Sequence, residues 1–467
     1  ISSYCLDFFA CFETIVRVFK KNDPKVIRAW TFYDWANSVY NLIISTAIFP
    51  IFYQAVTKSH AEKNGLVREI NGDSVDMIMF FGKEFVNTEL YSYVYSLSFL
   101  IVVILVPILS GIADYSGTKK RFMQFFCYLG AAGCMSLYFF DVENIEMSML
   151  PLFFASIGFW GSLVFYNSFL LEIADKDQHD QISARGFALG YIGSVLLLVT
   201  ILLLTQVLGI MPIRFAFVIV GAWWIGFAQY TYYYLPNSSH YIAREKKDNI
   251  IWNGYRELIK VWKELKNYRK VKWFLVSYFT YNMGVQTVML LAVLFASKEI
   301  NWIDDGEWWQ SSKIGLIVSI ILIQLIAVAG AYVLSSLSRR IGNLRTLMLS
   351  TFIWVICTII AYFIDLPLEF YFLAVIVGFI MGGTQSLSRS TYSKMLPKTD
   401  DSASYFSFYD VMEKVGLIIG PFLFGLLEGT FGNMRMSVLM MMVFFVVGFF
   451  LLNYTRIIEN KTVAPQN

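Results

Sequence analysis

The sequence predicts an all-α membrane protein with twelve transmembrane helices in two six-helix pseudo-repeats. Its 467 residues are 57% hydrophobic and only 15% charged, and the mean hydropathy is +0.57. Soluble proteins carry about 25% charged residues, so this composition excludes a soluble enzyme as the default interpretation. The net charge of +3 gives no indication of a nucleic-acid binder.

Twelve segments are apolar enough to cross a bilayer, which takes about 20 mostly apolar residues. We expect these spans at 29–55, 91–112, 122–140, 150–171, 186–208, 213–235, 272–297, 313–336, 344–364, 368–391, 404–428 and 433–456. Most connections are short, and three longer ones are expected at 56–90, 236–271 and 298–312.

The distribution of Lys and Arg predicts the orientation of the spans. Of the 37 basic residues, 29 fall in segments on the side of the N-terminus and 8 on the opposite side. Cytoplasmic loops carry an excess of Lys and Arg. We therefore expect both termini to be cytoplasmic.

A basic linker divides the chain into halves. The expected parts are an N-terminal segment (1–28), a first bundle (29–235), the linker (236–271), a second bundle (272–456) and a tail (457–467). Apolar linker residues from Ile251 to Leu265 recur at three- and four-residue steps, which predicts an amphipathic helix. Basic charge combined with Trp252 and Trp262 suits the cytoplasmic membrane surface. A linker helix packed under the bundles is the alternative, and we expect both descriptions to hold in part.

Residues 1–19 mix apolar and charged side chains and are too short and interrupted to span a membrane. No basic stretch precedes an apolar run with a small-residue cleavage site, so we expect no cleaved signal peptide. We favour an upstream extension or an alternative start over an amphipathic segment on the membrane.

Paired glycines recur at equivalent positions in the two halves. Gly186 and Gly190 open the fifth span, and Gly416 and Gly420 open the eleventh. G-x-x-x-G spacing lets helices approach closely in lipid. One such motif is weak evidence, but its recurrence favours the parallel six-span repeat of major facilitator transporters.

The connection between the second and third spans carries an informative motif, with Gly111, Asp114, Gly117, Lys120 and Arg121. It resembles the loop motif of the major facilitator superfamily. Asp114 can accept hydrogen bonds from the first N–H groups of a neighbouring helix or pair with a cation, and Gly117 permits a tight turn. We expect a latch that closes this end in one state, in preference to a basic loop with no such role.

The matching connection between spans eight and nine keeps a glycine and basic residues but has Arg339 in place of the acid. We therefore expect the second latch to be weaker or differently paired.

Four blocks carry a resemblance to a narrower family. They are Tyr33-Asp34-Trp35-Ala36-Asn37-Ser38, Ser183–Gly193, Tyr281–Thr287 and Gly382–Ser390. Together they resemble bacterial relatives of the fungal vacuolar amino-acid effluxers linked to autophagy, a branch of the major facilitator superfamily. The resemblance runs from about Val26 to about Tyr454. It implies a transporter of the bacterial cytoplasmic membrane in which two halves rock, and the fungal members imply amino-acid efflux.

Polar residues at membrane depth are candidates for the solute pathway, because an ionisable group there costs about 2.5–3.5 kcal/mol and usually faces a cavity. Asp34 fits a substrate-amine or proton site and equally an interfacial carboxylate at a helix start. The candidates are Asp34, Asn37, Tyr40 and Asn41 in span one, Tyr166 and Asn167 in span four, Tyr281, Asn282 and Gln286 in span seven, and Gln385 in span ten.

Charged residues near the inner ends of spans ten and eleven form a second set. Asp410 and Lys414 are four residues apart and can pair on one helix. We expect Arg389, Asp410, Glu413 and Lys414 to form an inner-side network for closure or gating, in preference to direct substrate contact.

We therefore expect a secondary active transporter of a small polar solute, with amino acids as first choice and with proton coupling and efflux. Its expected partners are the solute and the lipid bilayer; we expect a monomer without cofactor or metal. The alternatives are a transporter of a sugar or another small metabolite, a transport-inactive sensor and a membrane-embedded enzyme. An enzyme would need a convergent catalytic or metal set, which the scattered histidines and cysteines do not offer.

Overall fold

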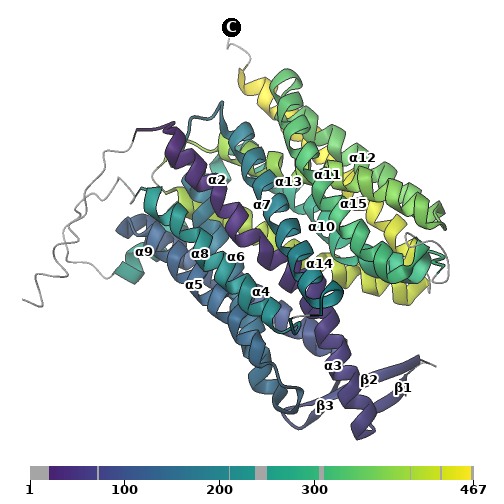
Figure 1. The fold of residues 1–467 in the computed structure, drawn as a ribbon. Coiled ribbons are helices and arrows are strands. Elements are labelled where there is room, and N and C mark those ends of the chain that lie inside the picture. Colours follow the sequence, from purple (N-terminus) through teal and green to yellow (C-terminus); the bar gives the residue numbers. More distant parts are fainter. Residues whose placement is uncertain are drawn as a thin grey trace, which may run out of the picture.

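The computed structural model describes residues 20–70, 73–209, 211–236, 250–303, 310–399, 401–431 and 434–463. Long helices lie side by side over most of the chain, and one small sheet lies at the end of the molecule opposite the C-terminus (Figure 1). The expectations for residues 1–19 and for the last residues of the tail fall outside the described residues.

The first helix group begins with one long rod. Asp23 caps the rod by accepting from Lys25 N at 2.8 Å, and Pro24 occupies the first turn, where its missing N–H costs nothing. The rod consists of α2 (Pro24–Val39), the π-helical segment η1 (Tyr40–Ala47) and α3 (Ile48–Asn64). The other helices of this group are α4 (Asn87–Ser116), α5 (Lys119–Ser136), α6 (Ile145–Ile173), α7 (His179–Leu202) and α8 (Phe215–Tyr234), with the short segments η2 (Leu137–Phe139), η3 (Val142–Asn144) and η4 (Leu203–Val207).

The second helix group follows the linker. The linker itself contains α9 (Ile250–Asn267). The group consists of α10 (Arg269–Glu299), α11 (Ser312–Ile341), α12 (Asn343–Phe363), α13 (Pro367–Met395), α14 (Ser402–Phe431) and α15 (Met434–Val463).

Eleven helical segments in the described chain are long and apolar enough to cross a membrane, and each coincides with an expected span. The remaining expected span, 404–428, corresponds to α14, which carries Asp410, Glu413 and Lys414 in its first half. Large apolar side chains such as Leu105 and Phe422 are exposed on the helices, as expected where helices contact lipid.

Buried apolar side chains form two cores, one built almost entirely from α2–α8 and one from α9–α15. Two residues cross over, since Tyr191 of α7 belongs to the second core and Ala403 of α14 to the first. The groups meet where α7 packs on α11 and α13, and where α14 packs on α4 and α6. The candidate site residues lie along these contacts.

The all-α expectation is wrong between the first two spans, where a three-stranded antiparallel sheet occupies part of the predicted 56–90 connection. Its strands are β1 (Val67–Ile70), β2 (Asp73–Phe80) and β3 (Lys83–Val86), in the order β1-β2-β3. Phe80 pairs with Lys83 across a two-residue turn in which Phe81 and Gly82 have φ of 47° and 74°. Tight hairpins favour such positive φ values. A count of apolar spans overlooks strands this short and rich in charge.

The linker helix α9 presents its aromatic side chains to the surface. Trp252, Tyr255 and Trp262 are exposed. Arg256 lies over the Trp252 ring at 5.6 Å and Lys266 over the Trp262 ring at 5.4 Å, measured to the ring centroids. Val261 and Leu265 are buried in the second core, and the half-exposed Trp262 ring also lies 5.4 Å from the Phe408 ring of α14, between centroids. The helix therefore packs on the second group along one face and leaves Trp252 and Tyr255 exposed.

Candidate functional site

A buried ion pair joins the two helix groups. Asp34 on α2 and Arg389 on α13 stand 355 residues apart, and Arg389 Nη2 lies 3.3 Å from Asp34 Oδ2. The hydroxyl of Tyr166 on α6 donates to the same carboxylate oxygen at 2.7 Å. The two charged side chains are only 7% and 3% exposed. Removing either partner would leave an uncompensated buried charge, so the contact constrains both groups.

The first helix group forms a socket around Arg389. The Nε atom donates to Ser183 Oγ at 2.9 Å, Nη2 donates to the Ser183 carbonyl oxygen at 3.0 Å, and Nη1 donates to Asn167 Oδ1 at 3.3 Å. The guanidinium also lies over the rings of Phe187 and Trp30, at 4.3 and 4.9 Å from their centroids. The planar fork and the stacking explain why an arginine suits this position better than a lysine.

Glycines bring the helices together at this socket. A Cβ built at Gly186 would lie 3.1 Å from Arg389 Nη2 and 3.2 Å from the Tyr166 hydroxyl. One turn later, a Cβ at Gly190 would lie 3.2 Å from the Asp34 carbonyl oxygen. Gly186 and Gly190 therefore let α7 lie directly against α2, and Gly420 plays the same part between α14 and α10.

A second polar contact between the groups joins α7 and α13. The Tyr191 hydroxyl of α7 donates to Gln385 Oε1 of α13 at 2.5 Å. The amide of Gln385 also lies 3.4 Å from the Met289 sulfur. Tyr281 contacts Ser388 at 2.6 Å within the second group, so Gln385 reaches across the interface and Tyr281 does not.

The other candidates in the first span have different surroundings. Asn37 is buried, and its Nδ2 has no hydrogen-bond partner among the described residues. Tyr40 packs against Phe159 in the first core, with ring centroids 4.6 Å apart. Asn41 is partly exposed. Because η1 begins at Tyr40, the α-helical stripe expected from Asp34 to Asn41 changes its register there.

The expected network of Arg389 with the acids and the lysine of α14 is divided into two clusters. Arg389 pairs with the first helix group, whereas Lys414 Nζ lies 2.5 Å from Asp410 Oδ1 and 3.0 Å from Glu413 Oε2. Gln286 on α10 donates to Glu413 Oε1 at 3.1 Å. One turn before it, Asn282 is buried, and its Nδ2 has no partner among the described residues.

Asp114 closes one end of the interface. Its carboxylate accepts from Ser404 N and Ser404 Oγ, both at 2.7 Å, and from Ala403 N at 3.2 Å, all in the first turn of α14. Lys119 lies 2.9 Å from Asp114 Oδ1 and donates to Ser402 Oγ at 2.7 Å. A carboxylate at a helix N-terminus satisfies free N–H groups and the helix dipole. The loop after α4 therefore holds the start of α14.

The rest of the loop motif shapes this contact. Gly117 has φ +66° and ends α4, while Gly111 is buried one turn before Asp114. Lys120 donates to the Leu235 carbonyl oxygen at 2.8 Å, and Arg121 is exposed.

A second closure, which the sequence analysis missed, centres on Asp180 at the start of α7. Asp180 accepts from Ser338 Oγ at 2.9 Å and from Asn343 Nδ2 at 2.7 Å, and it pairs with Lys394. Arg339, which stands where the matching loop has its acid, is exposed. The acid for this closure thus comes from the opposite helix group, and no local motif marks it.

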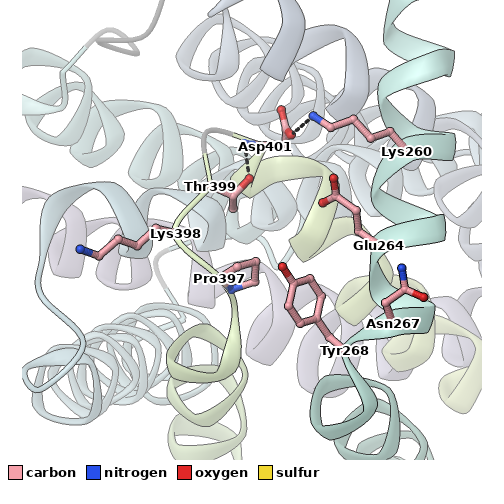
Figure 2. A pocket seen from close by; sticks show the side chains of 8 residues that line it. All are labelled: Lys260, Glu264, Asn267, Tyr268, Pro397, Lys398, Thr399 and Asp401. Carbon is pink, nitrogen blue, oxygen red and sulfur yellow. Dashed lines mark hydrogen bonds and ion pairs between the residues drawn. The ribbon is translucent and has the colours of Figure 1, made fainter.

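The linker helix is tied to the same end. Figure 2 shows a surface pocket of about 340 Å³ between α9 and the segment before α14, with Lys260 bound to Asp401 at 3.0 Å. The Tyr405 hydroxyl donates to Glu264 at 2.7 Å. Burial lowers the pKa of Lys260, but Glu257 and Asp401 outweigh this effect and raise it. The pocket is lined by linker and loop side chains and lies apart from the buried ion pair.

Comparisons with known proteins agree with this arrangement. The family described as "Vacuole effluxer Atg22 like" matches residues 22–462. An uncharacterized MFS-type transporter of Bacillus subtilis, YxiO, is 31% identical over 96% of this chain and 98% of its own. Autophagy-related protein 22 of Kluyveromyces lactis is 26% identical over 90% of this chain and 91% of its own.

Solved structures show the same fold. The transporter FucP in its outward conformation superposes with a TM-score of 0.64 at 15% identity, over 92% of this chain and 98% of FucP. A bacterial homologue of the iron transporter ferroportin, in the outward-facing state, gives 0.63 at 10% identity over the same shares of the chains. The chain is a multi-pass membrane protein with the major facilitator fold, and it belongs to the Atg22-like family of vacuole effluxers, which are transporters and not enzymes.

Proposed function

We propose that the protein is a secondary transporter that moves a small polar solute, of the amino-acid class, out of the bacterial cytoplasm. The observation that carries this proposal is the buried Asp34–Arg389 ion pair, whose members belong to different helix groups. A permanent scaffold gains little from a buried ion pair compared with apolar packing. A pair that forms and breaks as two groups rock provides a gate.

Alternating access follows from the position of the closures. Asp114 and Asp180 make their contacts at helix ends on one side of the interface, and Asp34 lies ten residues into α2 from that same side. The partners of all three come from the other group. We assign this side to the cytoplasm because it carries most of the Lys and Arg. The described arrangement then corresponds to a transporter closed toward the cytoplasm.

Amino acids are the favoured solutes because the helices carry both signs of charge at membrane depth. A solute with a carboxylate and an ammonium can pair with a buried cation and a buried acid together, whereas a neutral sugar offers neither charge. The family description supports efflux.

Counterflow in proteoliposomes tests the proposal. Vesicles with purified protein are loaded with one unlabelled amino acid and exposed to its labelled form, for each of the twenty amino acids in turn. We expect accumulation of at least one amino acid, and none in vesicles that carry the Arg389→Gln variant, which lacks the gate cation. The exposed Arg340→Gln variant serves as a matched control and should behave like the wild type. Absence of counterflow for every amino acid, with clear counterflow of sugars, would reject the substrate class.

A further inference from the structure

We propose that Trp160, Glu413 and Lys414 form the site that binds the two charged ends of the solute. The carboxylate of the solute would accept a hydrogen bond from Trp160 Nε1 and face the Lys414 ammonium. The ammonium of the solute would pair with Glu413. This inference takes one element from the proposed function, namely that the solute is a zwitterion of the amino-acid class. It differs from the expected gating role of Glu413 and Lys414.

The three side chains come from both helix groups. Lys414 Nζ on α14 lies 4.2 Å from the ring centroid of Trp160 on α6. Glu413 is held by Gln286 of α10 through a hydrogen bond of 3.1 Å. Lys414 stands twelve residues into α14, about 18 Å along the helix at 1.5 Å per residue, which places it near the middle of a bilayer. A solute bound here would contact both moving groups.

The indole N–H of Trp160 is a hydrogen-bond donor without an acceptor among the described residues. The residue is only 9% exposed, yet its Nε1 has no partner among the described residues. A buried donor without an acceptor costs about 1–3 kcal/mol, so the site gains when an acceptor arrives. Because Lys414 lies over the same indole ring, an anion that accepts from Nε1 is also attracted by the ammonium.

The cluster of Asp410, Glu413 and Lys414 has one more acid than it has cations, so one carboxylate can bind a solute ammonium. Two acids surround a single ammonium, and Asp410 holds it more closely, at 2.5 Å against 3.0 Å for Glu413. The side chains of Lys414 and Asp410 are 0% and 3% exposed, whereas Glu413 is 19% exposed. Glu413 is therefore the acid that a solute ammonium can reach. Its pairing with the solute would release it from Lys414, which then faces the solute carboxylate.

Two gentle substitutions test the site. Trp160→Phe removes the N–H and keeps a ring, and Glu413→Gln removes the charge and keeps the shape. Trp224→Phe on α8 is the matched control, because Trp224 is also buried with no partner for its Nε1 among the described residues, and its ring packs near Tyr40 and Phe159. Neither tested variant removes a partner from the buried Lys414–Asp410 pair, so both should fold.

The measurements are counterflow KM and thermal stabilisation of purified protein by amino acids, their methyl esters and their N-acetyl forms. The wild type should be stabilised by a free amino acid and by neither masked form. Trp160→Phe and Glu413→Gln should each raise the KM at least about fivefold, and Trp224→Phe should leave it unchanged. Glu413→Gln should also bind the N-acetyl form as well as the free amino acid, since the ammonium no longer has its partner.

The outcomes separate the two proposals. If amino acids are transported and both variants keep the wild-type KM, the site is wrong and the proposed function stands. If amino acids stabilise the wild type but are not transported, the transport proposal fails, and the same variants decide the site by their stabilisation. A wild type that is neither stabilised nor active with any amino acid overturns both.

Discussion

Asp34 and Arg389 neutralise each other only while α2 and α13 stay together. When the helix groups separate at this end, each charge needs another partner, because an isolated charge at membrane depth costs several kcal/mol. Asp34 can meet this need by taking up a proton. The ion pair thus supplies a physical basis, in one residue, for the proton coupling expected from the sequence.

We expect Asp34→Asn to reduce uptake driven by a proton gradient at least about tenfold, because the amide needs no proton when the pair opens. Counterflow should stay within about twofold of wild type, because Arg389 keeps its hydrogen bonds to Ser183 and Asn167, which Arg389→Gln removes. Labelled solute uptake into proteoliposomes, with and without an imposed gradient, measures both rates. Asp175→Asn is the control, since that side chain is 56% exposed and pairs with Lys21 on the surface. Undiminished driven uptake by Asp34→Asn would remove Asp34 from the coupling role.

Both members of the ion pair can be found in the sequence as charges inside apolar spans, but their pairing cannot. The residues stand 355 positions apart, and no local spacing rule connects them. Ser183 and Phe187 complete the socket, yet in the sequence they look like ordinary residues of a glycine-rich helix. Tertiary packing alone determines which acid faces which cation.

The carboxylate of Asp114 accepts the backbone N–H groups of Ala403 and Ser404 at the start of α14. The other contacts there, of Lys119 with Ser402 and of Tyr405 with Glu264, involve side chains. We expect Asp114→Ala to lower the stability by about 1–3 kcal/mol, the cost of leaving buried donors unsatisfied. Amide hydrogen exchange at residues 402–406 should accelerate, because local opening exposes these N–H groups. Glu84→Ala, which removes a surface ion pair with Arg68 at the far end, should change neither quantity. Unchanged exchange in Asp114→Ala would show that other contacts hold α14.

Two helix glycines, Gly330 and Gly226, differ in how closely a neighbouring helix approaches them. A Cβ at Gly330 of α11 would lie 2.6 Å from the carbonyl carbon of Phe379 on α13, and backbone cannot give way cheaply. A Cβ at Gly226 of α8 would meet nothing within 4 Å. Gly330→Ala should therefore lower the melting temperature by several degrees, since overpacking costs about 1–3 kcal/mol. Gly226→Ala should leave it unchanged or raise it, because alanine favours helix. Equal melting temperatures would contradict the packing of α11 on α13.

Individual elements differ in how far the sequence predicts them. Spans such as 91–112 are visible because a long apolar run has few alternatives to a membrane helix. The sequence does not reveal the sheet, because β1 and β3 have only four residues each and the eight residues of β2 do not alternate strictly between polar and apolar side chains. The linker helix α9 lies between these cases, with a clear helical period but no sign in the sequence of its ties to α14.

At the scale of the molecule, the closures around Asp34, Asp114 and Asp180 share one side of the interface. Their residues are far apart along the chain, so the joint opening of the closures requires the helix groups to move as bodies. The separate apolar cores make such a movement possible without unpacking either group.

Cysteine labelling in intact cells tests the orientation assigned to this side. In a background without the five native cysteines, we introduce Phe81→Cys on the sheet side and Arg339→Cys on the side of the closures, both at exposed positions. A membrane-impermeant maleimide should label only the cysteine at position 81, because basic loops stay in the cytoplasm. Permeabilised cells, in which both should react, provide the control. Labelling of position 339 alone would reverse the orientation.

The rod from α2 through η1 to α3 carries Asp34 near one end and leads into the sheet at the other (Figure 1). Its 41 residues span about 60 Å at 1.5 Å per residue. A small tilt of the rod at the ion pair therefore becomes a displacement of several ångströms at the turn between β2 and β3, because the displacement grows with distance from the ion pair. A fluorophore attached beside Phe81 would convert each opening of a buried gate into an optical signal in single molecules.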